Sequence, residues 1–198
     1  FVDPFGEWML KNYAPLKKYV GFHFDEYDKN IFTPVVRTAI READIKDHGH
    51  YTTYLPAYDD KKLVQLLLKI SKVRWHIFSK HTKKPYHVGR ISVYPVSGHD
   101  FIESVVTSTG VLCGAGFETP AEVLHLNKKL LVVPMKSQYE QHCNAAALKK
   151  LGVPVLKKVK KKSIPKIERW LEEGKPLNIS FADVASKAVE KTIEKFKG

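Results

Sequence analysis

One stretch of sequence decides the fold: Val111-Leu112-Cys113-Gly114-Ala115-Gly116-Phe117-Glu118-Thr119-Pro120-Ala121-Glu122. An apolar run typical of a buried strand comes first, a turn of small residues follows, and a helical pattern begins at about Ala121. Small residues in such a turn let backbone amides approach a ligand closely, and the helix N-terminus offers unpaired N–H groups to a phosphate. The stretch therefore predicts an anion-binding turn between a strand and a helix.

The same residues also have a purely structural explanation. Thr119, Pro120 and Glu122 are the residue types that cap an ordinary helix, open its first turn and complete a capping box. The stretch lacks the Gly-Lys-Ser/Thr ending of a Walker motif and the glycine spacing of a dinucleotide-binding fingerprint. Taken alone, it fits a helix start as well as it fits a binding site.

Outward from this stretch, short β-rich runs alternate with helical patterns, as in βαβ units. The expected strands are residues 51–55, 73–78, 88–94, 111–113, 130–133 and 153–156. The expected helices are a segment capped by Asp59 or Asp60 that runs to Ile70, and residues 100–106, 121–126, 138–151 and 164–171. The pattern predicts an α/β fold: a Rossmann-like parallel sheet in a three-layer arrangement.

A last helix is expected near the C-terminus. Ser180 and Asp183 resemble a capping box, and an apolar stripe runs from Phe181 through Ala188 to Phe196. A stripe of this kind is typical of a helix that packs in the core.

Composition limits the class of protein. The chain has 198 residues, of which 43% are hydrophobic and 27% charged, and this excludes disorder, collagen and coiled coil. No apolar run approaches the roughly 18 residues of a membrane span, no export signal is visible, and the two cysteines lack CxxC spacing. We therefore expect a cytoplasmic protein. Its net charge of +12 favours a polyanionic partner, such as a nucleotide, a nucleic acid or an anionic membrane.

A second polar cluster follows the next expected strand and contains Gln138, Glu140, Gln141 and Asn144. Because the carboxyl ends of neighbouring parallel strands meet at one edge of a sheet, where open α/β folds bind ligands, both clusters should face one crevice. Their amide and carboxylate groups suit the hydroxyls of a ligand, although each residue alone is also typical of a polar helix surface.

Together the two clusters resemble the C-terminal, donor-binding domain of GT-B glycosyltransferases, in particular the family of the cell-wall N-acetylglucosaminyl transferase that acts on lipid-linked muramyl peptide. The resemblance rests on residues 111–122, 129–134, 138–141 and 144–145. It implies metal-independent transfer of a sugar from a nucleotide-diphosphate sugar, with a UDP-linked donor as substrate and no cofactor. In agreement, the chain has no DxD motif that would hold a divalent cation.

The resemblance also implies roles for individual residues. The nucleotide-binding positions are Gly114, Gly116, Phe117, Glu118 and Thr119 at the diphosphate, Glu122 at the ribose hydroxyls, and the backbone near Gly98 and His99 at the base. The sugar-binding positions are Gln138, Glu140 and Gln141. Two features depart from the family: its polar pair is often Asp-Gln or Gln-Gln where this chain has Glu140-Gln141, and its common glycine-serine turn is replaced by Pro56-Ala57-Tyr58.

Residues 1–48 do not continue the alternation. They carry many aromatic side chains, including Phe1, Phe5, Trp8, Tyr13 and Tyr19, and one expected strand at residues 20–24. We expect residues 1–48 to be the tail of the N-terminal acceptor domain with an interdomain linker around residues 31–37, and residues 49–198 to be the donor domain. The catalytic base is then expected on the acceptor domain, on the same chain or on a partner protein, so this chain alone should be an inactive fragment.

Other interpretations stay open. A non-catalytic nucleotide or nucleic-acid binding module is one alternative function, and a UDP-sugar epimerase of GT-B architecture is another. The lysine run at residues 157–162 lacks any nucleic-acid recognition motif, so we expect no nucleic acid partner, and at most peripheral contact with the inner face of a membrane.

The histidines carry less information. His99 next to Asp100 fits a helix start better than a base with its orienting acid. The other histidines, including His50 and His76, show no metal-ligand spacing. We predict no metal site and expect these histidines to lie on the surface.

Overall fold

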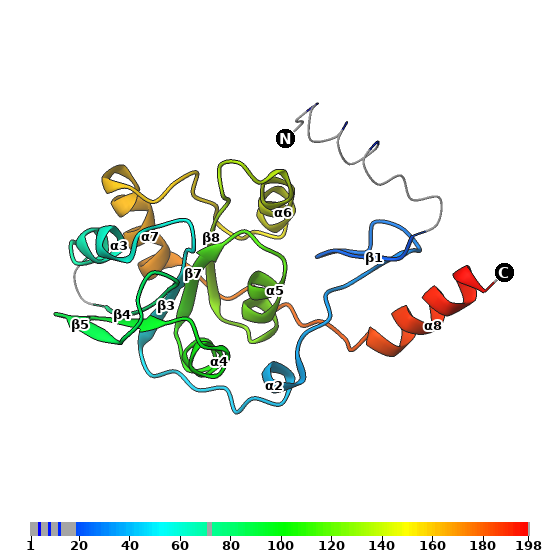
Figure 1. The fold of residues 1–198 in the computed structure, drawn as a ribbon, viewed down its shortest axis with the longest axis horizontal. Helices are drawn as coiled ribbons and strands as arrows, with labels where there is room; N and C mark the ends of the chain where they lie inside the picture. Colours follow the sequence, from blue (N-terminus) through cyan, green and yellow to red (C-terminus); the bar gives the residue numbers. More distant parts are fainter. Residues whose placement is uncertain (1–3, 5–7, 9–11, 13–18, 71–72, 198) are drawn as a thin grey trace.

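A computed structural model describes residues 19–70 and 73–197, together with Pro4, Trp8 and Asn12. The expectations that concern Phe1, Phe5 and Tyr13 lie outside these described residues. Figure 1 shows a central sheet with helices on both of its faces, and a C-terminal helix that extends away from this body.

The central sheet has six strands in the order β5-β6-β4-β3-β7-β8. The strands are β3 (His50–Tyr54), β4 (Arg74–Ser79), β5 (Tyr86–Val88), β6 (Ile91–Pro95), β7 (Gly110–Gly114) and β8 (Lys129–Val133). All neighbours are parallel except β5, which is antiparallel to β6. The expected parallel sheet is confirmed, and its carboxyl ends meet at one edge because Tyr54 pairs with both Phe78 and Cys113.

Helices cover both faces of the sheet, which gives the expected three layers. One layer consists of α3 (Asp60–Leu67) and α7 (Ile164–Glu173), and the other of α2 (Thr38–Arg41), α4 (Gly98–Val106), α5 (Glu118–His125) and α6 (Tyr139–Lys150). Side chains alternate along each strand, so Leu112 packs in the α3 and α7 layer while Val111 and Cys113 pack in the other. The first layer also buries Trp75 and Trp170, whose rings both contact Tyr51.

Local signals set several boundaries as expected. Asp59 caps α3, because its carboxylate accepts a hydrogen bond from the backbone of Lys62 at 3.0 Å. Gly152 follows α6 with φ of +97°, a conformation that glycine adopts without strain. Two short strands, β1 (Gly21–Phe22) and β2 (Ile31–Phe32), pair in parallel and account for part of the strand expected at residues 20–24.

Two expected strands are wrong in detail. Residues 88–94 are not one strand: β5 and β6 form a hairpin that turns at Gly89, whose φ of +57° suits a glycine. Residues 153–156 form only an isolated bridge between Val155 and Val132, because Pro154 has no N–H to donate to a ladder.

The C-terminal stripe is not core. Helix α8 (Ala185–Phe196) begins after Val184, and no side chain caps it, so the expected capping box of Ser180 and Asp183 is also wrong. Asp183 instead accepts a hydrogen bond from the backbone of Ala185, directly at the helix start. Phe181 and Ala188 are buried, but the last two side chains of the stripe are about half exposed, Ile193 at 46% and Phe196 at 53%, as is the neighbouring Val189 at 58%. Helix α8 extends away from the central sheet (Figure 1), and its second half instead contacts the segment around β1 and β2: Lys191 Nζ lies over the Phe32 ring, and Lys195 Nζ donates a hydrogen bond to the Tyr19 carbonyl at 2.9 Å.

Candidate functional site

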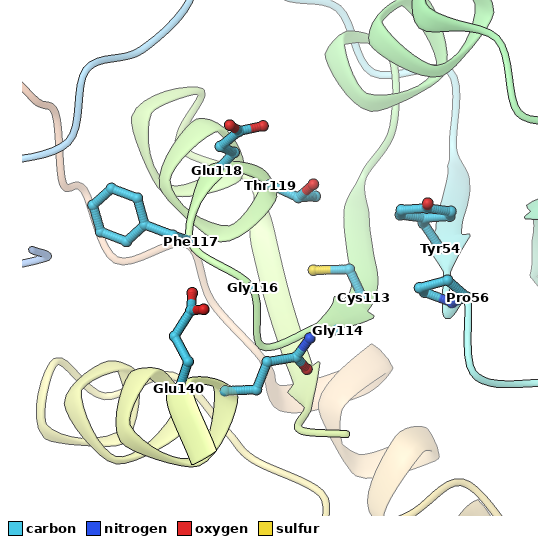
Figure 2. A pocket seen from close by; sticks show the side chains of 10 residues that line it. Tyr54, Pro56, Cys113, Gly114, Gly116, Phe117, Glu118, Thr119 and Glu140 are labelled. Carbon is cyan, nitrogen blue, oxygen red and sulfur yellow. The ribbon is translucent and has the colours of Figure 1, made fainter. Parts of the chain in front are cut away.

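A cavity of about 300 Å³ opens at the carboxyl ends of β3 and β7, where the sequence predicted a crevice. We call it the turn pocket. Its lining residues are Tyr54, Pro56, Cys113, Gly114, Gly116, Phe117, Glu118, Thr119, Glu140 and Gln141 (Figure 2). The turn pocket therefore brings together seven of the eleven predicted site residues, from both polar clusters.

The glycines of the turn provide space. A Cβ atom added at Gly116 would meet nothing within 4 Å, and one added at Gly114 would meet only Gln141 Oε1 at 3.6 Å. Neither glycine has a positive φ, so the backbone conformation does not require them. Their effect is to leave the backbone beside the pocket uncovered, as a close approach by a ligand requires.

Helix α5 points its N-terminus at this space. It begins at Glu118, earlier than the sequence predicted, and its N-cap residue Phe117 makes no side-chain cap hydrogen bond. Thr119 therefore lies in the first turn and does not cap the helix. The first-turn amides carry the positive end of the helix dipole, and they favour an anion at this position.

Helix α6 forms the opposite wall with Glu140 and Gln141 (Figure 2). Gln141 Oε1 accepts a hydrogen bond from the backbone of Met135 at 3.0 Å, and its Nε2 donates to Gln138 Oε1 at 2.7 Å. Gln138 does not line the pocket, but it holds the amide of Gln141 in one orientation. Asn144 Nδ2 approaches Glu140 Oε1 at 3.5 Å.

Glu122 lies beside the turn pocket but not in its lining. Its side chain is only 5% exposed, and its carboxylate accepts two hydrogen bonds from Arg37, at 2.5 Å from Nε to Oε1 and 2.8 Å from Nη2 to Oε2. The hydrogen bond to Glu122 raises the pKa of Arg37, while partial burial acts in the opposite direction. The structure thus pairs the expected ribose-binding carboxylate with a guanidinium from the segment expected to be a linker.

Gly98 and His99 begin α4 and are not brought into the turn pocket. Ser97 caps this helix by accepting from the backbone of Asp100 at 3.1 Å. His99 Nδ1 lies 3.6 Å from the Asp100 carboxylate, and both side chains are exposed, at 88% and 63%. This geometry agrees with the helix-start interpretation of the pair.

Sequence reasoning missed three lining residues: Tyr54, Pro56 and Cys113. The signal was available, because Tyr54 lies one residue before the end of the first expected strand and Cys113 ends the strand before the turn. The Tyr54 ring packs on Phe101 of α4, with centroids 5.5 Å apart. Burial raises the pKa of Cys113 well above its usual range, so the thiol stays protonated.

The charges of the turn pocket are unusual for an anion site. Glu118 and Glu140 both line it, and none of the described residues in its lining is a lysine or arginine. Attraction for an anion must then come from backbone amides and from cations at the rim. Arg37 is a nearby cation, since it interacts electrostatically with Glu118 of the pocket lining as well as with Glu122.

Two histidines correct the expectation of a surface location. His50 is 2% exposed, and its ring stacks on His76 with centroids 3.9 Å apart. Burial, and then the proximity of His50, lower the pKa of His76 to about 4. Both line a second cavity of about 500 Å³ beside β4, β6 and α4. Within the described residues, no three His, Cys, Asp or Glu side chains are grouped as metal ligands would be.

Comparisons with known proteins agree with this architecture. Residues 20–173 match the family described as Glycosyl transferase family 1. Among solved structures, MurG of Acinetobacter baumannii is similar with a TM-score of 0.61 and 19% identity, over 98% of this chain and 64% of MurG. The spinosyn forosaminyltransferase SpnP is similar with a TM-score of 0.53 and 13% identity, over 98% of this chain and 62% of SpnP. The solution structure of ALG13 has a TM-score of 0.49 and 17% identity, over 72% of this chain and 95% of ALG13.

No curated protein matches the chain in sequence. No helix among the described residues is long and apolar enough to cross a membrane. The chain spans slightly less than two thirds of the length of MurG and SpnP. Its fold is that of the C-terminal domain of GT-B glycosyltransferases, as the sequence predicted. The family match covers more than three quarters of the chain, and the chain therefore belongs to glycosyl transferase family 1.

Proposed function

We propose that this chain binds a nucleotide-diphosphate sugar, UDP-linked, and is the donor-binding part of a metal-independent glycosyltransferase. The observation that carries the proposal is the turn pocket. It places an open helix N-terminus and the uncovered backbone at Gly116 opposite the polar side chains of Glu140 and Gln141. One end suits a diphosphate and the other suits sugar hydroxyls.

In this proposal each wall has its own part in the reaction. The diphosphate lies against the backbone of residues 114–119. Glu140 accepts hydrogen bonds from the sugar hydroxyls, and Gln141, which Gln138 holds in place, accepts or donates further hydrogen bonds with them. Glu122 takes the ribose hydroxyls, and the backbone near Gly98 and His99 takes the base. When the glycosidic bond breaks, negative charge grows on the leaving diphosphate, and fixed N–H dipoles stabilise it without reorganising.

The proposal also concerns the rest of the enzyme. Residues 49–198 form the donor domain, and residues 1–48 belong to the acceptor domain and the linker. The acceptor domain, on the same chain or on a partner, supplies the catalytic base. The half-exposed apolar side chains of α8 support such a partner, because an apolar stripe of this kind is normally covered. We place the enzyme in the cytoplasm, with peripheral contact at the inner face of the membrane.

Isothermal titration of the chain with UDP tests donor binding. Glu122→Ala should weaken UDP binding about ten- to a hundredfold, since a charged hydrogen-bond acceptor contributes roughly 1.5 to 3 kcal/mol. Glu172→Ala, on the exposed surface of α7, is the matched control and should bind as the original chain does. If the original chain binds RNA but no nucleoside diphosphate, the donor-binding proposal is wrong. If the original chain binds UDP and Glu122→Ala binds it with the same affinity, Glu122 has only a structural role.

A further inference from the structure

The contact between Arg37 and Glu122 joins two parts of the chain that are 85 positions apart. Its two hydrogen bonds, at 2.5 and 2.8 Å, come from two guanidinium nitrogens and use both carboxylate oxygens. A guanidinium held in this way fixes the orientation of the carboxylate as well as its charge, which a single ammonium group does not.

Burial shows which partner depends on the other. The Glu122 side chain is 5% exposed, whereas the Arg37 side chain is 49% exposed. A buried carboxylate without a partner is strongly destabilised, while a half-exposed guanidinium can be hydrated. Glu122 therefore depends on Arg37 for its partner and for its position. A carboxylate has about four acceptor positions, and the two hydrogen bonds from Arg37 leave about two free for neighbouring hydroxyls.

The backbone of Arg37 is itself held firmly. Arg37 is the N-cap residue of α2, and its carbonyl accepts hydrogen bonds from Ile40 and Arg41 at 2.9 and 3.0 Å. Val36 and Ile40 on either side are 3% and 1% exposed, and they anchor the segment in the same core layer as α5. The guanidinium thus comes from a rigid support.

The negative charges on helix α5 give a second reason why Arg37 matters at this site. Helix α5 presents two carboxylates, Glu118 and Glu122, next to the place proposed for a diphosphate. Arg37 interacts with both, and it is the cation that the structure places beside them. Without it, an anionic ligand would meet two uncompensated negative charges.

We propose that Arg37 is a positioning residue of the donor site: it holds the Glu122 carboxylate in the orientation that accepts the ribose hydroxyls of a nucleoside diphosphate. This inference rests on the proposed donor binding and adds a residue outside the recognised motif. The inference requires that the two hydrogen bonds of Arg37 contribute to nucleotide binding in addition to its positive charge.

The test compares the affinities of variants for UDP and 2′-deoxy-UDP by titration calorimetry on the 198-residue chain. Arg37→Gln should weaken UDP binding about tenfold or more and should remove the preference for UDP over 2′-deoxy-UDP. Arg37→Lys keeps the charge but cannot make both hydrogen bonds, so it should not restore the preference. In the double variant with Glu122→Gln, the two effects should not add, because both remove the same contact.

Arg41→Gln is the matched control. Arg41 lies on the same short helix, and its guanidinium donates to the carbonyls of Val36, Phe181 and Ala182 and not to Glu122. It should change the melting temperature without changing the ratio of the two affinities. An Arg37→Gln chain that keeps the original ratio, or binds UDP more tightly, overturns the inference. Failure of the unaltered chain to bind UDP would instead overturn the proposed function.

Discussion

Gly110 and Gly116 lie six residues apart, but a methyl group added at each would meet very different surroundings. At Gly110 the new Cβ would lie 2.7 Å from Lys129 Cβ and 2.8 Å from the Lys129 carbonyl oxygen, both in the neighbouring strand. Since a paired strand cannot move aside, Gly110→Ala should destabilise the protein by about 1 to 3 kcal/mol in urea unfolding.

Gly116→Ala is the contrasting variant, because its methyl group has free space. It should unfold at the same urea concentration as the original chain but bind UDP about tenfold less tightly, since the methyl group fills room that the ligand needs. A loss of stability in Gly116→Ala, or unchanged UDP binding, would contradict the interpretation of this glycine as space for a ligand.

The stacked His50 and His76 predict how stability depends on pH. Burial lowers the pKa of both rings, for His76 to about 4, so the folded protein keeps them neutral while the unfolded chain binds protons near pH 6.5. Their contribution to stability is therefore present above pH 6.5 and is lost as the pH falls toward 4. We expect the free energy of unfolding to fall by about 1 to 2 kcal/mol between pH 7 and pH 4.5 from this pair.

Chemical unfolding at a series of pH values measures this effect. His76→Gln cannot be protonated, so its stability should fall less steeply over the same range. His81→Gln, which changes an exposed histidine, should follow the original curve. Parallel curves for all three proteins would show that the buried pair does not control the acid sensitivity.

At the scale of elements, three segments that are distant in sequence form one basic surface, which we call the lysine face. Residues 57–70, 80–84 and 157–162 hold eleven lysines and two aspartates, a net charge of +9 out of the chain's +12. All eleven lysines are exposed. The Val159 backbone donates a hydrogen bond to Tyr58, and Tyr86, two residues after the second segment, donates one to Asp60. The lysine run is therefore part of a larger structured surface.

This surface favours contact with anionic lipid. Each basic residue near a charged membrane contributes about 1 kcal/mol, and the exposed side chain of Leu68 lies among the lysines. The chain should sediment with vesicles that contain phosphatidylserine, and less so as salt is added. Changing the five lysines of residues 157–162 to glutamine should reduce binding at least tenfold.

The matched control changes five exposed lysines elsewhere to glutamine, so that the net charge falls equally; these are Lys136, Lys149, Lys150, Lys175 and Lys187. Equal sedimentation of the two variants would show that overall charge, and not the lysine face, attracts the chain to vesicles. Tighter binding to RNA than to vesicles would point to the other class of polyanion.

Some elements could be predicted from the sequence because their signals are local. The strand, turn and helix around Gly116 needed only the apolar run, the small residues and Pro120. The sequence did not show that β5 and β6 are two strands. Residues 88–94 have the pattern of one strand, and only the positive φ of Gly89 in the structure reveals the turn between them. The pairing of Arg37 with Glu122 was also invisible, because no local pattern joins residues 85 positions apart.

At the scale of the whole molecule, the exposure of α8 could not be predicted from the sequence, because it too depends on residues that are distant along the chain. The stripe on α8 looks like a core stripe, and only the arrangement of every other element shows that half of it stays exposed. Part of the candidate site could also be predicted from the sequence. Seven predicted residues line the turn pocket because parallel strands bring their carboxyl ends together, whereas the locations of Gly98 and His99 depend on how α4 packs.

The whole-molecule prediction concerns turnover. The chain spans 64% of the length of MurG, and we expect that it will not transfer sugar at a useful rate by itself. Adding the acceptor domain that the proposal requires, on the same chain or as a partner protein, should restore turnover, measured as UDP release from a panel of UDP-sugars with a lipid extract as acceptor. In that complete enzyme, Glu122→Ala should lower turnover. Robust transfer by residues 1–198 alone would disprove the division into two halves.

The location of the tryptophans determines which changes in this protein intrinsic fluorescence can detect. Trp75 and Trp170 are 1% and 4% exposed in that layer, and Trp8 is 61% exposed; none of the three is among the described residues that line the turn pocket. Intrinsic fluorescence will therefore follow the opening of the α3 and α7 layer during unfolding. We expect it to change little when a nucleotide enters the turn pocket, so an optical assay of donor binding needs a fluorophore on the ligand.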